Sequence, residues 1–436
     1  MRHGRAMALV ALLAGAIAGD AKAADFLVRP VTPAAGGSVD APEGARTWPS
    51  VEAVLKSGGL KGGDRILLMA GDHGPLVVRG ARFAVPVVIE PQPGAAAHVG
   101  SITTNDAAFV TFRGLQVWPK GGAMPGFAVV LSGKKTADLV FEGLDIRSAD
   151  DAAGFAGWAL EDWRANKVSG MLLQGARTTV RDVTVTGAYN GILLTGDGGV
   201  IEGSLVDGFS GDGMRALGND SRISHNTIRN CIIINDSHRD GIQSYSTGPD
   251  DKPGAGTQRR LVIEGNRILE WTLPVASPLR CAMQGIGMFD GMFDGVRIEN
   301  NVIVVSAYHG IAMAGALNSV IRNNTVVAAN GRGGKRPWIR VGAHKNGTPS
   351  GNVLVTGNLT NFLNTKADAG KGIVVSGNVT AVPLRDFVDF GRLDLRLRPS
   401  SPAVDAADRV ASAATDIDGV ARWKGQGPDA GAHESY

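Results

Sequence analysis

The stretch VRIENNVI, residues 296–303, decides the fold together with VIRNNTV, residues 320–326. Each stretch alternates apolar and polar side chains, turns at a pair of asparagines and then returns to apolar residues. Alternation with a period of two is typical of β-strands, and asparagine favours a sharp turn between them. Asn301 and Asn324 are 23 positions apart, so the pattern indicates a repeating unit.

The same pattern recurs from about residue 100 onward around a Gly, Asp or Asn. Its pivots are Gly114, Gly143, Asp182, Gly203, Asn226, Asn266, Asn301, Asn324, Asn358 and Asn378. The shortest spacings between pivots are 20 to 23 residues. A unit of that length with short strands and no helical pattern cannot bury its own apolar face and must stack on the next unit. We therefore predict an all-β solenoid, a single-stranded right-handed parallel β-helix. We expect its Asn side chains to form a ladder, each in the left-handed backbone region that asparagine tolerates.

The two ends of the chain carry different patterns. A basic start, an apolar run over residues 6–18 and Ala-Lys-Ala before Ala24 predict a signal peptide over residues 1–23, cleaved after Ala23, and hence a periplasmic or secreted protein. Residues 24–380 are expected to form the β-helix, with a capping α-helix within residues 48–59. The Pro- and Gly-rich residues 381–436 are expected to form an irregular tail packed on the last rungs.

Charge and cysteine content exclude several classes of partner. The 44 basic and 41 acidic residues become 41 and 40 once the signal peptide is removed, with Arg2, Arg5, Lys22 and Asp20. So balanced a chain favours neither nucleic acid nor an anionic membrane as its partner. No later stretch has the ~18 consecutive apolar residues of a membrane span. Cys231 and Cys281 are too few for a disulfide framework, and the sequence leaves their pairing open. We expect a monomer.

A second ladder accompanies the first, in strands of the form x-Gly-apolar. These strands are YNGILL, GDGMRA, RDGIQS, MQGIGM, YHGIAM and, less regularly, PWIRVG. They would stack polar residues near one edge of a single sheet, namely Asn190, Asp212, Asp240, Gln284, His309 and Arg340. Alternation directs the isoleucines inward, and it places Arg215 and Gln243 outward on the same face as Arg239 and Tyr308. Strands about 4.8 Å apart would form a groove several sugar rings long, a geometry suited to a polymer.

Long insertions flank this second ladder. The pivot spacing rises to 40 residues between Asn226 and Asn266, and to 35 between Asn266 and Asn301. Insertions in solenoids usually gather on the binding side. A further insertion, residues 148–167, contains Trp158 and Trp163, which we expect to offer platforms for sugar rings.

The stretch INDSHRDGIQ, residues 234–243, concentrates polar chemistry on this face. One interpretation is a solvated polar turn. A second is a calcium site, because carboxylates such as Asp212, Asp236 and Asp240 suit calcium, whereas zinc would need more histidines than His238 and His309. A third is catalysis, in which His238, or else His309 or Tyr308, takes a proton α to a carboxylate while a cation stabilises the charge that develops. The available cations are Arg239, Arg215, Arg340 and Lys345.

The chain resembles the secreted bacterial β-helix proteins of the pectate-lyase superfamily over nearly its whole mature length. The resemblance lies in GDRILLMAGDHGPLVVRG at residues 63–80, in PVVIEPQPG at residues 86–94, in the Asn rungs, and in SPAVDAA, DIDG and DAGAHE near the end. It implies a β-helix fold and an acidic polysaccharide as partner. The superfamily contains lyases, hydrolases, epimerases and adhesins, so fold alone does not select an activity.

Two narrower resemblances compete. DSHRD is similar to the Asp-Pro-His-Asp motif of mannuronan C5-epimerases, with Asp236 and His238 in matching order, but Ser237 replaces Pro and Arg239 is inserted before Asp240. RDGIQ, YHGIAM and WIRVGAHK look like three of the four polygalacturonase motifs. The paired acids of that family are missing, because Met283 and Gln284 stand on the intervening rung. A hydrolase would therefore have to use Asp212 with Asp240 or Asp236.

The sequence thus favours an exported polysaccharide lyase that acts on a uronic-acid-containing polymer by β-elimination. Hydrolase, C5-epimerase and non-catalytic glycan-binding protein remain alternatives. The predicted catalytic residues are His238, Arg239, Asp240, Asp236, His309 and Arg340. The predicted substrate-binding residues are Arg215, Gln243, Tyr308, Lys345, Asp212 and Gln284. The only cofactor considered is calcium, at the three aspartates named above.

Overall fold

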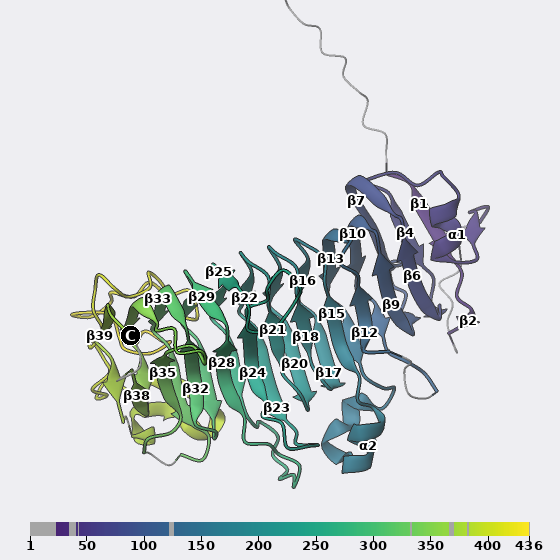
Figure 1. The fold of residues 1–436 in the computed structure, drawn as a ribbon. Helices are drawn as coiled ribbons and strands as arrows, with labels where there is room; N and C mark the ends of the chain where they lie inside the picture. The colour runs from purple at the N-terminus through teal and green to yellow at the C-terminus, as the bar shows by residue number, and fades with distance from the viewer. Residues whose placement is uncertain are drawn as a thin grey trace, which may run out of the picture.

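The structure is a computed structural model that describes residues 23–34, 41, 43–121, 126–331, 334–365, 370–381 and 383–435. The predicted signal peptide, residues 1–23, lies outside the described residues except for its last position. The described chain winds through three sheets whose strands stack on one another in successive turns (Figure 1). Nearly all the strand pairs within the three sheets are parallel, which confirms the predicted β-helix.

We name the three sheets A, B and C in the order in which each turn visits them. Sheet A consists of β1 (Asp25–Val28), β3 (Thr47–Trp48), β4 (Arg65–Leu68), β7 (Arg82–Pro91), β10 (Ala108–Arg113), β13 (Ala137–Glu142), β16 (Thr179–Arg181), β19 (Val200–Glu202), β22 (Arg222–Ser224), β25 (Thr257–Arg259), β26 (Val262–Glu264), β29 (Met292–Asp294), β30 (Arg297–Glu299), β33 (Ala316–Arg322), β36 (Gly351–Thr356) and β39 (Ile373–Ser376).

Sheet B follows sheet A across the pivot of each turn. It consists of β2 (Thr32–Pro33), β5 (Gly71–Asp72), β8 (Ala97–Val99), β11 (Gln116–Val117), β14 (Asp145–Arg147), β17 (Thr184–Ala188), β20 (Leu205–Phe209), β23 (Thr227–Cys231), β27 (Arg267–Leu269), β31 (Val302–Val305), β34 (Thr325–Ala328), β37 (Leu359–Thr360) and β40 (Val379–Thr380).

Sheet C completes each turn and contains the second ladder. It consists of β6 (Pro75–Arg79), β9 (Ser101–Asn105), β12 (Ala128–Ser132), β15 (Ser169–Leu173), β18 (Ile192–Leu194), β21 (Met214–Ala216), β24 (Asp240–Tyr245), β28 (Gln284–Asp290), β32 (His309–Ala314), β35 (Trp338–Gly342) and β38 (Phe362–Asn364).

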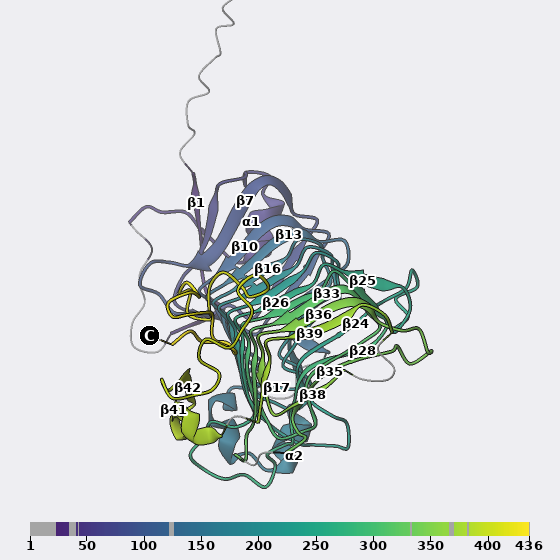
Figure 2. The ribbon, with the colours of Figure 1, turned by 90° about the vertical axis from the view of Figure 1, so that its left-hand side faces the viewer.

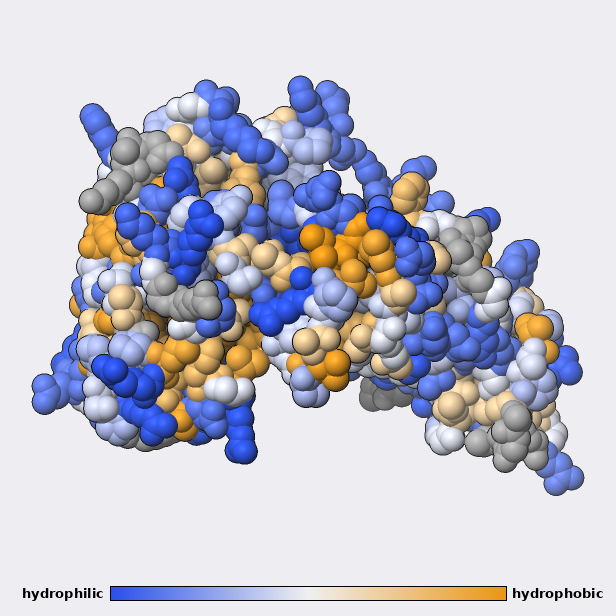
Figure 3. All heavy atoms as spheres, turned by 90° about the horizontal axis from the view of Figure 1, so that it is seen from below, coloured by the Kyte–Doolittle hydropathy of each residue, from blue (hydrophilic) through white to orange (hydrophobic). Residues whose placement is uncertain are grey.

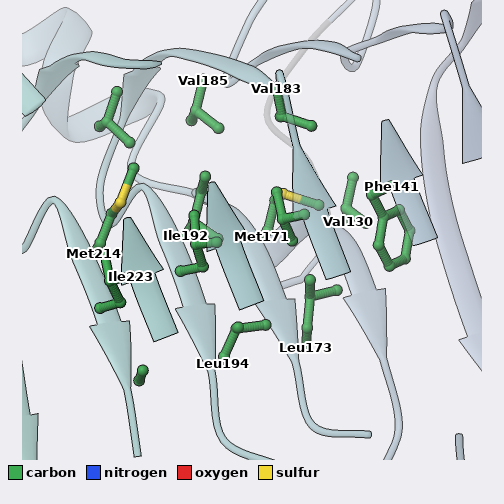
Figure 4. Packing of buried hydrophobic residues seen from close by; sticks show 14 of the residues in the cluster. Val130, Phe141, Met171, Leu173, Val183, Val185, Ile192, Leu194, Met214 and Ile223 are labelled. Carbon is green, nitrogen blue, oxygen red and sulfur yellow. The ribbon is translucent and has the colours of Figure 1, made fainter. Parts of the chain in front are cut away.

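The core fills the space between the sheets. Side chains such as Met171, Val185 and Ile192 from neighbouring strands point into it and pack in rows along the stack (Figure 4). Phe112 and Phe141 stack on each other with ring centroids 5.1 Å apart. Each turn covers the apolar face of its neighbour, so the core is continuous although no single turn could form one alone.

The predicted Asn ladder is present at the corner between sheets A and B. The backbone N–H of Asn226 donates to Oδ1 of Asn266 at 3.0 Å, and the same link continues through Asn301, Asn324 and Asn358 to Asn378. Each Nδ2 group also donates to the Oδ1 of the next asparagine in the ladder. The amides thereby satisfy buried polar groups along the corner, as a buried turn requires.

The predicted backbone conformation of the ladder asparagines is wrong by one position. The residue in the left-handed region is the one before each ladder asparagine, for example Asn300 with φ 57° before Asn301 and Asn323 with φ 51° before Asn324. The earlier pivots Gly114, Gly143, Asp182 and Gly203 are themselves left-handed residues. The residue at φ > 0 makes the bend, which leaves the next side chain directed inward, where it can bond to its neighbours.

Helices occupy the margins of the stack. Helix α1 (Val51–Lys56) buries Val51 and Val54 against the first turns, which confirms the predicted cap. The others are α2 (Leu160–Ala165) and the 3-10 helices η1 (Ala152–Gly157), η2 (Leu384–Asp386) and η3 (Phe390–Arg392). Among the described residues, no helix has the length and apolar character needed to cross a bilayer.

The described tail, residues 383–435, lies along sheet B and the A–B corner (Figure 2). It includes the small antiparallel pair β41 (Phe387–Asp389) and β42 (Asp394–Leu397). Its apolar residues pack on the outward residues Val302 and Val304 of β31 and Val327 of β34.

Candidate functional site

The strands of sheet C stack as the x-Gly-apolar pattern predicts. Ile242 pairs with Met214 on one side and with Ile286 on the other, and all three side chains are buried. The alternate positions face outward and place Gln243, Gly287, Ala312 and Arg340 on successive strands. The small residues Gly287 and Ala312 therefore stand at the centre of this outward row. A Cβ added at Gly287 would come within 2.6 Å of the Asp240 carboxylate and of the Phe289 ring, so only glycine fits there.

A pocket of about 230 Å³ opens on this outer face of sheet C. It is lined by His238, Gln243, Ser244, Tyr245, Gln284, Phe289, Asp290, Tyr308, His309 and Lys345. The residues come from β24, β28 and β32, from the loops just before β24 and β32, and from the segment after β35, which are far apart in sequence. Half of the predicted site residues thus meet here, namely His238, Gln243, Gln284, Tyr308, His309 and Lys345.

His238 and Asp240 form a pair at the entrance to β24. The His238 Nδ1 atom lies 3.1 Å from Oδ2 of Asp240, and the side chains of the two residues are 56% and 0% exposed. The same carboxylate oxygen accepts a hydrogen bond from Nε2 of Gln243 at 3.0 Å. A carboxylate at Nδ1 favours the tautomer with the proton on that nitrogen, so the Nε2 lone pair of a neutral His238 is left to act as a base.

The charges of the pair depend on each other. The hydrogen bond to Asp240 raises the pKa of His238 above its ordinary 6.5, against the opposing effect of burial. Burial raises the pKa of Asp240, whereas the hydrogen bond from His238 lowers it. The buried carboxylate and the exposed imidazole therefore hold a proton between them more firmly than an isolated histidine would.

A ladder of hydrogen bonds from backbone N–H groups to side-chain oxygens of the preceding turns holds Asp240 in place. Its N–H donates to Oδ1 of Asp212 at 3.0 Å, and the Asp212 N–H donates to Oδ1 of Asn190 at 2.9 Å. Asp212 is buried and bonded to the Arg215 guanidinium, with Nε 2.8 Å from Oδ2. Oδ1 of Asp240 is buried without a hydrogen-bond partner among the described residues. Asp212 and Asp240 therefore support the turn, and neither carboxylate faces the pocket as a separate charge.

The predicted role of Arg239 as a cation for the substrate is wrong. Its side chain is only 3% exposed and turns away from the pocket. The guanidinium donates to the backbone carbonyls of Ser210 and Asn235 at 3.2 and 2.8 Å, and also to the carbonyl of Ser237. It therefore fixes the loop 232–239 that carries His238, because its hydrogen bonds join this loop to itself and to Ser210 of the preceding turn.

The predicted calcium site is not assembled either. Asp212 is paired with Arg215, and Asp240 is paired with His238 and Gln243. Asp236 is exposed in the preceding loop. Across the described residues, no three His, Cys, Asp or Glu side chains gather into a group that could hold a metal ion. These carboxylates do not fit calcium, and no chemical step here is assigned to a metal.

His309 begins β32 on the far side of the pocket from His238. Its Nδ1 atom accepts a hydrogen bond from Nε1 of Trp338 at 2.9 Å. Its ring packs against Phe289 and Tyr308, with centroids 4.7 and 4.2 Å away. Burial, with the nearby Arg340 and His238 charges, lowers the pKa of His309 to about 4. A neutral imidazole that accepts at Nδ1 carries its proton on Nε2, so His309 is a hydrogen-bond donor and not a base.

Two of the four predicted cations, Lys345 and Arg215, are paired with acids. Lys345 forms an ion pair with Asp290, and both side chains line the pocket and remain about half exposed. Arg215 is bonded to Asp212 and lies near the Tyr245 ring. Arg340 lies on the outward row beyond Ala312. Lys345 is thus the cation that reaches the pocket itself.

Insertions on the B–C corner support the loop before β24. Trp163 and Phe155 from residues 148–167 are buried with Ile232 and Ile234 of that loop. The prediction that Trp163 is a sugar platform is therefore wrong, because its ring is a core residue of this insertion. The surface seen in Figure 3 mixes apolar and polar side chains. A disulfide joins Cys231, at the end of β23, to Cys281, just before β28, and so ties the His238 loop to the next turn.

Four pocket residues were not predicted from the sequence: Ser244, Tyr245, Phe289 and Asp290. Tyr245 and Phe289 lie at the far ends of the strands that begin at Asp240 and Gln284. The signal that could have revealed them is strand length, because β24 and β28 are longer than the three-residue strands β18 and β21 of the preceding turns. Strand length is poorly marked by alternation alone, because the end of a strand is set by the loop that follows.

Comparisons with known proteins agree with this architecture. Residues 169–382 match the family described as right handed beta helix region. Pectate lyase Pel9A has a similar structure, with 14% identity, a TM-score of 0.50, and coverage of 95% of this chain and 96% of that chain. The A-module of the Azotobacter vinelandii mannuronan C-5 epimerase AlgE6 shares 14% identity at a TM-score of 0.44, over 76% of this chain and 93% of that chain.

A polysaccharide lyase of family PL6 from Pseudopedobacter saltans shares 14% identity at a TM-score of 0.42, over 80% of this chain and 95% of that chain. No curated protein matches the sequence. At 14% identity, the similarity to pectate lyase Pel9A shows the fold alone, and a fold does not select an activity.

Proposed function

We propose that this chain, which has a right-handed β-helix fold, is an exported enzyme that cleaves a uronic-acid-containing polysaccharide by β-elimination. The observation that carries the proposal is the His238–Asp240 pair beside a pocket that also contains His309 and Lys345. The Cys231–Cys281 disulfide supports export, because disulfides persist in oxidising compartments such as the periplasm.

His238 is the proposed base. Elimination removes the proton on the carbon next to the uronate carboxylate, breaks the bond to the neighbouring glycosidic oxygen and forms a carbon–carbon double bond. The Nε2 atom of neutral His238 takes the proton, and Asp240 stabilises the imidazolium that results. The leaving glycosidic oxygen takes a proton from water, and the protonated His238 then gives its proton to the hydroxide that remains, so atoms and charges balance.

Lys345 and His309 are proposed to bind the substrate. Negative charge moves onto the substrate carboxylate as the proton leaves, and a cation at that position lowers the barrier. Lys345 reaches the pocket and supplies this charge once its bond to Asp290 is exchanged. His309 donates from Nε2 to a sugar or carboxylate oxygen, and the exposed Tyr308 ring beside it gives a surface for the sugar.

Hydrolysis is less well supported by the same geometry. An inverting glycosidase needs two carboxyl groups about 6.5 to 9.5 Å apart, on opposite sides of the bond that breaks. Asp240 and Asp212 are buried and bonded within the turn, so neither can flank a sugar. Asp236 is exposed but stands alone in its loop.

C5-epimerisation is a second candidate, because it begins with the same proton abstraction. It then returns a proton to the opposite face of the ring. The presence of Tyr308 and His238 at the same pocket favours this candidate, since one group can take the proton and the other return it. The two activities share the base and differ in the product.

The direct test is incubation of the purified protein with polygalacturonate, alginate and other uronate polymers. β-Elimination gives an unsaturated uronate that absorbs in the ultraviolet, hydrolysis gives reducing ends without that absorbance, and epimerisation changes only the sugar composition. We expect the ultraviolet absorbance to rise. Activity without unsaturated product on every polymer would contradict the proposal.

A matched pair of variants tests the base. His238→Asn should lower turnover by about 10²- to 10⁴-fold, the usual share of general-base catalysis. His225→Asn changes another exposed histidine, which lies at the A–B corner with φ 54°, a conformation that asparagine tolerates. It should leave turnover unchanged. Full activity of the His238 variant would transfer the role of base to Tyr308.

A further inference from the structure

The tail presents an exposed tryptophan on a rigid support. Trp423 is 63% exposed, whereas the preceding residue, Arg422, is fully buried. The Arg422 guanidinium donates to Oδ1 of Asn300 at 2.8 Å, and to the carbonyls of Gly431 and Ala432 at 2.8 and 3.1 Å. These bonds fix the backbone at Trp423 to the β-helix, although its own ring stays in solvent.

The segment opposite Trp423 is fixed as well. The Ala413 N–H donates to Oδ1 of Asn323 at 2.8 Å, and Arg322 donates to the carbonyl of Ala411 at 3.2 Å. Thr415 and Ala421 form an antiparallel bridge that joins the two segments. The backbone that carries the ring is thus already ordered before a ligand binds, so only the side chain loses conformational freedom on binding, which favours binding.

Between these segments lies an open hollow of about 580 Å³, which we call the tail platform. It is lined by Arg409, Val410, Ser412, Ala414, Trp423 and Gly425. Val410 is 95% exposed, and Arg409 is also exposed, with no ion-pair partner among the described residues. The carboxylate of the adjacent Asp408 accepts from the Val410 and Ala411 N–H groups at 2.8 and 3.4 Å. Arg409 is therefore available to an external anion.

We propose that the tail platform is a second saccharide-binding site, separate from the pocket on sheet C, and that its ligand is an acidic polysaccharide. The apolar face of a sugar ring stacks on an indole ring, and the planar guanidinium of Arg409 matches a uronate carboxylate. A hollow of 580 Å³ is large enough for a short saccharide. That the ligand is acidic rests on the proposed function, whereas the position of the binding site rests only on the residues of the tail.

The position of the tail platform makes it a non-catalytic site. Its segments are bonded to Asn300 and Asn323 at the A–B corner, whereas His238 and Lys345 line the outer face of sheet C. Figure 2 shows the tail and the strands β24 and β28 on opposite sides of the stack. One sugar segment cannot fill both sites, but two segments of a long chain can. The platform would therefore raise the affinity for polymers more than that for short oligosaccharides.

The test measures binding in a His238→Ala background, so that the polymer is not consumed. Gel retardation by polygalacturonate, alginate and neutral hydroxyethyl cellulose would be compared for added Trp423→Ala, Trp423→Phe and Arg409→Ala changes. We expect Trp423→Ala to weaken retardation by the better acidic polymer about tenfold, Arg409→Ala somewhat less, and Trp423→Phe least. Phe127→Ala, which removes another highly exposed aromatic ring, serves as the matched control and should bind like the parent.

Several results would overturn the proposal. Unchanged retardation of the Trp423→Ala protein would exclude the site, and equal loss on the neutral polymer would exclude the acidic ligand. A parent protein that is dimeric in size-exclusion chromatography and becomes monomeric with Trp423→Ala would identify the surface as a contact between copies. Binding through Trp423 without any turnover of wild-type protein would leave the platform standing while the proposed function fails. Turnover by the wild-type protein with no effect of Trp423→Ala on binding would mean that the proposed function stands and the platform fails.

Discussion

At the scale of single residues, the exposed His238 and the buried Asp240 have different roles in proton transfer: His238 takes the proton, and Asp240 orients the imidazole ring. Asp240 is held by the Asp212 ladder and Gln243, so it can orient the imidazole without contacting a substrate. His238 keeps its Nε2 edge towards solvent. The same residues on a free loop would offer the same chemistry but no fixed tautomer, and the rate of proton transfer depends on that geometry.

The pH dependence of turnover follows from this pair. A base must be unprotonated, and the bond to Asp240 raises the pKa of His238 above its ordinary 6.5. We therefore expect kcat/KM to rise with pH through an apparent pKa above that value. His309, with a pKa of about 4, stays neutral throughout this range and should add no second transition to the pH profile. A profile that is flat from neutral to alkaline pH would contradict the assignment of His238 as the base.

Asp240→Asn should affect both the rate and the profile. The amide removes the negative charge that raises the pKa of His238, so the rise of kcat/KM should move to lower pH. It also loses control of the tautomer, which costs about 10³- to 10⁴-fold in kcat in comparable pairs. Pre-steady-state rates and the pH profile would be measured together. If only protein stability falls, Asp240 has a structural role and no part in positioning the base.

Asp290→Asn should improve binding of acidic substrates. Lys345 is now paired with Asp290, and a substrate carboxylate has to replace that bond. Removing the competing charge should lower KM for a uronate oligosaccharide by a few-fold, since exposed pairs contribute about 0.2 to 1 kcal/mol. Lys345→Ala should raise KM instead. A higher KM for Asp290→Asn would mean that Asp290 binds the substrate itself.

At the scale of secondary-structure elements, the corners of the β-helix have different roles. The A–B corner carries the Asn ladder and the tail, and it stabilises the fold. The B–C corner carries the Asn190–Asp212–Asp240 ladder, the disulfide and the insertions, and it positions His238. Both corners use a side-chain oxygen that accepts a backbone N–H from a neighbouring turn, which is the preceding turn at the A–B corner and the next turn at the B–C corner. The difference lies in the loops that follow.

The Asn ladder can be tested at its centre. Asn301→Leu leaves the N–H of Asn266 without its acceptor in a buried corner, whereas Oδ1 of Asn324 loses the side-chain donor but keeps the backbone N–H of residue 301. Each unpaired buried group costs about 1 to 3 kcal/mol, so the free energy of unfolding should fall by at least that amount. Chemical denaturation would measure it. Asn105→Leu, at the exposed end of β9, is the control, and equal effects of the two changes would show that the ladder adds no stability.

At the scale of the whole molecule, stacking makes the protein long. The eleven strands of sheet C, spaced about 4.8 Å apart, span about 50 Å along the axis in the described chain. We expect an elongated monomer in solution, with a radius of gyration above the roughly 22 Å of a compact chain of this length. Small-angle scattering would measure both shape and mass. A compact particle, or one of twice the mass, would contradict this expectation.

The sequence by itself determined the repeat and therefore the fold. Period-two alternation and regularly spaced asparagines are local features, and a short β unit with one apolar face has few ways to bury it other than stacking. The same alternation correctly separated inward Ile242 from outward Gln243. It failed at the left-handed position beside Asn301, because the bend and the ladder occupy adjacent residues that alternation does not distinguish.

Only the tertiary structure decided which polar residues work together. Arg239 and Asp212 read as charged groups of the site, yet they are buried within the turns, because a loop residue can fold back on carbonyls supplied by other strands. Phe289, Asp290 and Trp338 meet His309 only through strand register. Burial and partners are set by residues far away in sequence, so the tautomer of each histidine, and with it the division between base and donor, could not be known before the turns were stacked.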